Sequence, residues 1–154
     1  MGFFLEYDQS NNTVRLTFEG SITPDDIGGG AYNTLRSFVA SRPPCKGIAD
    51  FSNVKVVEVA SRMIQDRARL PPVLGGQLFV IVAPEDHLFG LSRMFSLHAE
   101  RTRPHIHVVR RMDEAYRLLG IETPEFKPVS DCFRTRSCSA EGKVRNCRKG
   151  FCGW

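Results

Sequence analysis

One continuous apolar run constrains the fold of this chain more than any other feature. The run Leu78–Ala83 contains no polar residue, and Pro84, Glu85 and Asp86 follow it as a helix start. A short strand that is apolar at every position is typical of parallel sheets, in which helices cover both faces. Parallel strands also need crossover connections, which are usually helices. The run therefore predicts the central strand of an α/β domain.

The segments on either side of this strand alternate between strand and helix patterns. Two β-prone runs, residues 3–7 and 14–18, flank the polar segment 8–12, which is the pattern of a β-hairpin. Elsewhere, strands are predicted over 47–51 and 106–109, and helices over 24–42, 58–70, 86–99 and 113–119. The order ββαβαβαβα predicts a mainly parallel sheet of four to five strands with an N-terminal antiparallel hairpin and about four helices.

The first helix is predicted to begin at Pro24. Thr23 is a favourable N-cap residue, proline suits the first helical position, and Asp25 and Asp26 suit the positive end of the helix dipole. The glycines at 28–30 each cost roughly 1 kcal/mol relative to alanine in a helix. We therefore expect a frayed or late first turn.

The chain has two compositions. Residues 1–122 contain 14 Lys and Arg and 14 Asp and Glu, whereas residues 123–154 contain 7 and 3, so the excess of positive charge belongs to the tail. The tail also has few aliphatic residues to offset the entropy of ordering it. We expect one domain over residues 1–120 and a basic, cysteine-rich tail over 121–154 that is disordered.

The tail leaves two alternatives to disorder. Four cysteines, Cys132, Cys138, Cys147 and Cys152, could bind zinc tetrahedrally, although they lack the paired C-x2-C spacing that makes such sites specific. Its seven cations could also contact nucleic acid. Disorder is favoured over both, so the sequence predicts no metal site and no nucleic-acid partner.

Three phrases in the body carry a family resemblance. The segments Gly47–Val54 (GIADFSNV), Val82–Asp86 (VAPED) and Phe89–Phe95 (FGLSRMF), together with the order of elements, resemble the SpoIIAA-like (STAS-like) family over residues 1 to about 120. The resemblance implies a sheet covered by helices. It also implies one of two functions: a switch partner of a kinase-like anti-sigma factor, or a binder of lipids or small anionic ligands.

The switch function implies a phosphorylated hydroxyl at the start of a helix. In this chain the corresponding stretch is Glu58-Val59-Ala60-Ser61. The phosphoacceptor position falls on Ala60, so Ser61 becomes the candidate phosphoacceptor if the register shifts by one residue. A phosphate there would reset the charge of a partner surface.

Ligands of open α/β sheets usually bind at the carboxyl ends of the strands. We therefore predict a ligand or partner surface in a crevice at those ends, where the helix that starts near Asp86 could meet an anion and Arg93 lies two turns along it. The alternative makes Asp86 a cap, Phe89 a core residue, Gly90 a packing contact and Arg93 a partner in a surface ion pair. The predicted surface comprises Asp50, Phe51, Ser61, Asp86, Phe89, Gly90 and Arg93.

The sequence contains no convincing catalytic or nucleotide-binding motif. The triple glycine lacks the spacing of phosphate-binding loops, and no residues are placed to complete a catalytic triad. His105 and His107 lie on one face of a predicted strand and could hold a metal, but two histidines on a solvent or edge face explain the pattern without any ligand, and this interpretation is favoured.

These observations favour a non-enzymatic binding module without a cofactor. A regulatory protein-interaction domain predicts a filled interior, whereas the alternative, a small lipid or anionic-ligand binding protein, predicts a cavity. The sequence shows no basic signal-peptide region and no apolar stretch long enough to span a membrane, so we expect a cytoplasmic protein. A homodimer is compatible with the pattern, because a sheet edge can be shared between two copies.

Overall fold

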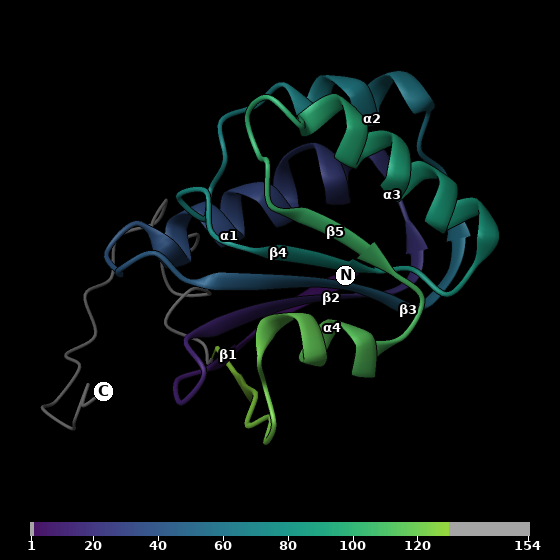
Figure 1. Ribbon diagram of the computed structural model, residues 1–154. Coiled ribbons are helices and arrows are strands. Elements are labelled where there is room, and N and C mark those ends of the chain that lie inside the picture. Colours follow the sequence, from purple (N-terminus) through teal and green to yellow (C-terminus); the bar gives the residue numbers. More distant parts are fainter. Residues whose placement is uncertain (1, 130–154) are drawn as a thin grey trace, which may run out of the picture.

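A six-stranded mixed sheet forms the centre of the molecule. The computed structural model describes residues 2–129 of the chain (Figure 1). In this part of the chain the strand order is β5-β4-β3-β2-β1-β6. The strands are β1 (Phe3–Asp8), β2 (Thr13–Ile22), β3 (Lys46–Val57), β4 (Phe79–Val82), β5 (Ile106–Val109) and β6 (Lys127–Pro128).

Helices cover both faces of this sheet. Figure 1 shows α1, α2 and α3 on one face and α4 on the other. A short π-helix, η1 (Asp26–Gly30), leads into α1. The α-helices are α1 (Ala31–Val39), α2 (Ser61–Ala68), α3 (Asp86–Ala99) and α4 (Met112–Leu119).

The predicted fold class is confirmed. Strands β1 and β2 form the antiparallel hairpin, and β2, β3, β4 and β5 pair in parallel. The apolar run is β4, which is buried between two helical layers as its composition requires. Val80 and Val82 face the α4 side, and Ile81 faces the α1–α3 side.

The structure differs from the prediction in two places. β3 extends to Val57 because residues 53–57 continue to pair with β2 across two register shifts, so α2 begins at Ser61 rather than near Glu58. The first helix begins at Pro24, as predicted, but its glycine-rich turn, Asp26–Gly30, is a π-helix. Gly30 is needed there because a Cβ at this position would lie 2.9 Å from the Phe3 ring.

The sixth strand was not predicted. β6 pairs with β1 through Glu6↔Pro128 and Tyr7↔Lys127, beyond the predicted domain limit at residue 120. Two residues, one of them a proline, carry no β pattern that a sequence could reveal. The tail cysteines Cys132, Cys138, Cys147 and Cys152 lie outside the described residues, so disorder and zinc binding in the tail stay predictions.

A buried carboxylate connects the hairpin to the segment that leads to β6. Asp8 is fully buried, and its oxygens accept hydrogen bonds from the Asn11 backbone N–H at 3.0 Å, the Asn11 side-chain amide at 2.7 Å and the Glu125 backbone N–H at 2.8 Å. Burial acts to raise the pKa of this carboxyl, but the hydrogen bonds from Glu125 and Asn11 outweigh it, and the pKa is lowered. Asp8 therefore stabilises the fold in its charged form.

Replacing Asp8 by Asn is expected to lower the free energy of unfolding by roughly 1.5–3 kcal/mol at pH 7, because an amide NH2 then faces N–H donors. The charged carboxyl stabilises the fold above its unfolded-state pKa of about 3.9, and this contribution is lost as the pH falls through the lower folded-state value. The difference between wild type and Asp8→Asn should therefore shrink in urea unfolding at about pH 2. Asp66→Asn, at an exposed carboxylate, is the control. Equal stability of wild type and Asp8→Asn at pH 7 would contradict this role.

Candidate functional site

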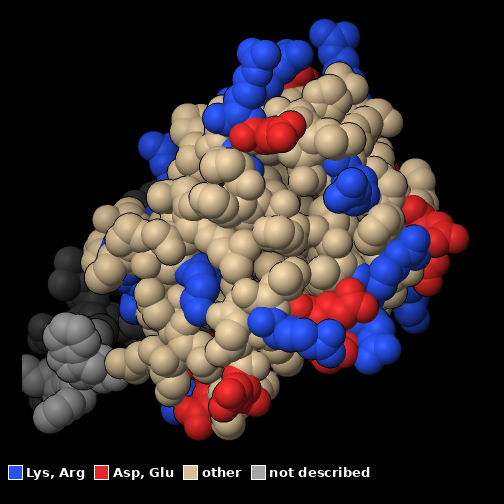
Figure 2. Space-filling view, in the orientation of Figure 1, with Lys and Arg blue, Asp and Glu red and all other residues tan. Residues whose placement is uncertain are grey.

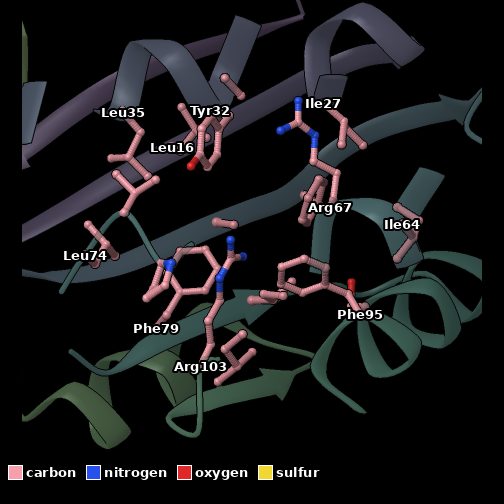
Figure 3. A pocket seen from close by; sticks show the side chains of 18 of the residues that line it. Leu16, Ile27, Tyr32, Leu35, Ile64, Arg67, Leu74, Phe79, Phe95 and Arg103 are labelled. Carbon is pink, nitrogen blue, oxygen red and sulfur yellow. The ribbon is translucent and has the colours of Figure 1, made fainter. Parts of the chain in front are cut away.

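An apolar pocket lies between the sheet and the layer formed by α1, α2 and α3. Its volume is about 190 Å³, and it is partly open to solvent. Figure 3 shows side chains from the strands, the helices and the connecting loops converging on this space. Apolar residues make up most of the lining: Leu16, Phe18, Ile27, Ala31, Leu35, Ala49, Phe51, Ile64, Pro72, Val73, Leu74, Phe79, Ile81, Leu88, Leu91, Phe95 and Ile106.

Strand alternation produces this apolar floor. Successive side chains of a strand point to opposite faces, so every second residue of the four parallel strands faces the pocket. Ala49 lies at its centre, aligned with Leu16 of β2 and Ile81 of β4. Ala31 covers it from the start of α1. Small side chains at these two positions leave the neighbouring large ones without atoms to pack against.

The pocket opens at the amino-terminal ends of β4 and β5. Gln77 and His105 are the exposed members of its lining, and they lie directly before these two strands. The polar side chains of Tyr32, Arg67 and Arg103 are also part of the lining. This opening lies at the opposite end of the strands from the crevice predicted from the sequence.

The two arginines at the pocket are held differently. The Arg103 Nη2 donates hydrogen bonds to the carbonyl oxygens of Leu70 at 3.0 Å and Pro71 at 3.2 Å, while its Nε is buried and has no partner among the described residues. Arg67 stacks over the Tyr32 ring, with its guanidinium carbon 5.1 Å from the ring centroid. The Tyr32 hydroxyl donates to the Pro71 carbonyl oxygen at 3.3 Å.

Burial lowers the pKa of both guanidinium groups. For Arg103, the nearby positive charge of Arg67 contributes further to the lowering. Both groups remain cations at neutral pH, since arginine is not deprotonated in proteins. The opening of the pocket therefore carries two positive charges that repel each other.

The predicted site residues are distributed over several surfaces. Asp50 and Phe51 point to opposite faces of β3: Phe51 lines the pocket, whereas Asp50 is buried on the α4 side, where its Oδ1 accepts a hydrogen bond from the Ser52 backbone N–H at 2.9 Å. Ser61 is the exposed first residue of α2. Of the predicted surface, Phe51 alone belongs to the lining of the pocket.

The other predicted residues lie at the start of α3. Asp86 is exposed and pairs with Arg110 at 2.6 Å, and the Arg110 guanidinium lies 4.1 Å from the centre of the Phe89 ring. Gly90 and Arg93 are exposed on the same helix, and a Cβ on Gly90 would meet nothing within 4 Å. These residues form an exposed helix end, and partner binding there stays a prediction.

His105 and His107 are exposed. Within residues 2–129, no group of three or more His, Cys, Asp or Glu side chains is arranged to hold a metal ion. None of the helices in this range combines the length and the hydrophobicity that a membrane span requires.

Sequence reasoning missed Tyr32, Arg67 and Arg103. Tyr32 lies on α1 and Arg103 in the segment before β5, and both donate a hydrogen bond to the Pro71 carbonyl oxygen, a long-range arrangement that no local pattern predicts. Arg67 had a usable signal, because it lies three residues after Ile64 and directly before Ala68, the two buried residues of α2. A residue at that spacing lies on the inner side of its helix.

The fold is an α/β domain with a six-stranded mixed sheet and an interior pocket. Comparison with solved structures finds the anti-sigma factor antagonist SpoIIAA in its unphosphorylated form, at 15% sequence identity and a TM-score of 0.50, over 79% of this chain and 99% of that chain. An uncharacterised protein from the DUF3478 family with a SpoIIAA-like fold, from Shewanella loihica PV-4, is 14% identical with a TM-score of 0.48, over 76% of this chain and 91% of that chain. The predicted resemblance is thus confirmed at the level of fold. No family model and no curated protein sequence matches the chain.

A substitution at the centre of the pocket tests whether the space is there. Ala49→Leu should fold with a free energy of unfolding equal to or above that of wild type, because the added methyl groups enter empty space. Ala115→Leu makes the same change at a fully buried position against α4, outside the pocket lining, and should lose roughly 1–3 kcal/mol through overpacking. Urea unfolding measures both. An equal loss in the two variants would show that the pocket is closed.

Proposed function

We propose that this chain is a non-enzymatic binding module that holds a small hydrophobic ligand in its interior pocket. The observation that carries the proposal is the apolar space of about 190 Å³. In another protein, an engineered cavity of about 150 Å³ lined by Leu, Ile and Phe stays dry and binds benzene. By the same measure this pocket accommodates roughly six to ten carbon atoms.

The energetics of an empty pocket support this proposal. Closed cavities in apolar cores cost about 24 cal/mol per Å³, so for this partly open space of 190 Å³ the cost has an upper bound on the order of 4–5 kcal/mol. Folded domains have net stabilities of only about 5–15 kcal/mol. A ligand that fills the pocket would recover much of this cost through dispersion contacts and burial of its own apolar surface.

The arginines and the tyrosine at the pocket support binding rather than catalysis. A catalytic pocket needs an acid or base of suitable pKa facing a second reacting group. The two arginines retain their protons at neutral pH, and the Tyr32 hydroxyl donates to a backbone carbonyl. The likeness in fold to a protein named as an anti-sigma factor antagonist also favours a non-enzymatic role.

The wild-type protein is expected to bind the neutral ten-carbon fluorescent probe 1-aminonaphthalene and to release it to octanol. The reason is that the lining offers apolar contacts and excludes water from the probe. Fluorescence titration measures binding and displacement. Ala49→Leu should lose the binding, whereas Ala115→Leu, if folded, should retain it. Unchanged binding by Ala49→Leu would place the probe elsewhere and contradict the proposal.

A second candidate, a regulatory protein-interaction domain, is favoured by the likeness to SpoIIAA and by the position of Ser61. This residue is exposed at the amino-terminal end of α2, where Ala60 makes no capping hydrogen bond and no acidic residue occupies the first turn. A phosphate on Ser61 would meet free backbone N–H groups and the positive end of the helix dipole. Such a modification would place about two negative charges on this surface.

This second candidate predicts phosphate on Ser61 in protein isolated from its native cells. Peptide mass spectrometry after enrichment of phosphopeptides measures it, and a Ser61→Ala chain expressed in the same cells is the control. Ser61 that is unmodified under growth and under starvation would remove the support for a phosphorylation switch.

A further inference from the structure

The arginines at the opening of the pocket differ from the other arginines of the described chain, which are either paired with a carboxylate or exposed to solvent. Arg15, Arg69, Arg110, Arg111 and Arg117 each form an ion pair. Arg67 and Arg103 form none among the described residues, although both are partly buried and line an apolar space. Burying a charge without a counter-charge is costly. A bound anion would therefore compensate these two charges.

The hydrogen-bonding state of the two guanidinium groups indicates where an anion fits. Arg103 is fixed by the Leu70 and Pro71 carbonyl oxygens through one nitrogen, which leaves its buried Nε without an acceptor. Arg67 makes no hydrogen bond to the described residues and is held by stacking on Tyr32. Figure 3 shows both side chains reaching into the same pocket, from α2 and from the segment before β5.

The surroundings of these groups are apolar. The Arg103 guanidinium carbon lies 5.3 Å from the centre of the Phe95 ring, and Leu74 and Phe79 line the same pocket. An anion bound here would have hydrocarbon next to it. A free inorganic anion would leave the apolar space empty. An amphiphile would place its charged group at the arginines and its hydrocarbon in the apolar space.

We propose that Arg67 and Arg103 bind the anionic headgroup of an amphiphile, a carboxylate or a phosphate, whose hydrocarbon chain of about eight carbons occupies the pocket. This inference rests on the proposed function and adds the chemical class of the ligand. An anion between the two guanidinium groups offsets their mutual repulsion and gives the buried Arg103 Nε an acceptor.

The charge of the helical layer favours the approach of such a ligand. Segments 61–69 and 86–103 contain six arginines and three carboxylates. Figure 2 shows Lys and Arg side chains projecting over α2 and α3, while the surface below them in this view is largely uncharged. A positive region next to an apolar pocket raises the local concentration of anionic ligands.

The test is isothermal titration calorimetry of the full chain with octanoate, octyl phosphate, octanol and inorganic phosphate. We expect at least one of the two anionic amphiphiles to bind about tenfold tighter than octanol or more, because charge-assisted hydrogen bonds are added to the same hydrocarbon contacts. Inorganic phosphate should bind far more weakly than either amphiphile. The Arg67→Met and Arg67→Met/Arg103→Met variants should lose the preference for the anion and retain the affinity for octanol. Arg62→Met, at an exposed arginine of α2, is the matched control and should behave as wild type.

The outcomes separate this inference from the proposed function. Binding of octanol with no gain from either anionic headgroup would overturn the headgroup site and leave the hydrophobic pocket intact. Failure of all three eight-carbon ligands to bind would overturn both. Inorganic phosphate that binds as tightly as the amphiphiles would replace the amphiphile by a free anion. Should Arg103→Met fail to fold, Arg67→Met alone decides, because Arg67 makes no hydrogen bond or ion pair in the described chain.

Discussion

Burial of β4 on both faces is the constraint on which the rest of this structure depends. A strand that is apolar at every position needs a helical layer on each side, and its parallel neighbours need helical crossovers to return the chain. One helix, α4, covers Val80 and Val82, and three helices cover the face of Ile81. The hairpin and β6 extend the sheet beyond β3 and give the larger layer a wider floor. The pocket lies under that larger layer.

Side chains pack differently on the two faces of the sheet, and the proposed function rests on this difference. Ala115 and Leu119 of α4 pack against β3 and β4 with almost no exposed surface. On the other face, Ala31 and Ala49 are small where a closed core would need volume, and Arg67 and Arg103 bring charge to the edge of the gap. Empty apolar space and unpaired charge both reduce stability. Their occurrence at one place is explained by a ligand with an apolar chain and an anionic group.

The sequence predicted those helices and strands that are determined by residues close together in the chain. The apolar run that forms β4 and the acidic start of α3 each indicate their element from neighbouring residues alone. Such signals were enough to predict the order of elements and the fold class. β6 could not be predicted, because its two residues are held against β1 by long-range contacts, among them the hydrogen bond from the Glu125 backbone N–H to Asp8. The pocket also depends on tertiary structure, since Tyr32, Arg67 and Arg103 come from three separate segments. Asp50 follows strand alternation onto the α4 side, away from the pocket that Phe51 lines.

The most direct test of this account locates a ligand inside the molecule. Isotope-filtered nuclear Overhauser spectra of the methyl-labelled protein with unlabelled octanol report which methyl groups lie within about 5 Å of the bound chain, as close packing in a filled pocket requires. The account predicts contacts to the methyl groups of Ala49 and Ile81 and none to those of Val82 and Ala115, which lie on the opposite face of the sheet. Contacts to Val82 and Ala115, or no contacts at all with octanol in excess, would contradict the claim that the space above Ala49 is a binding pocket.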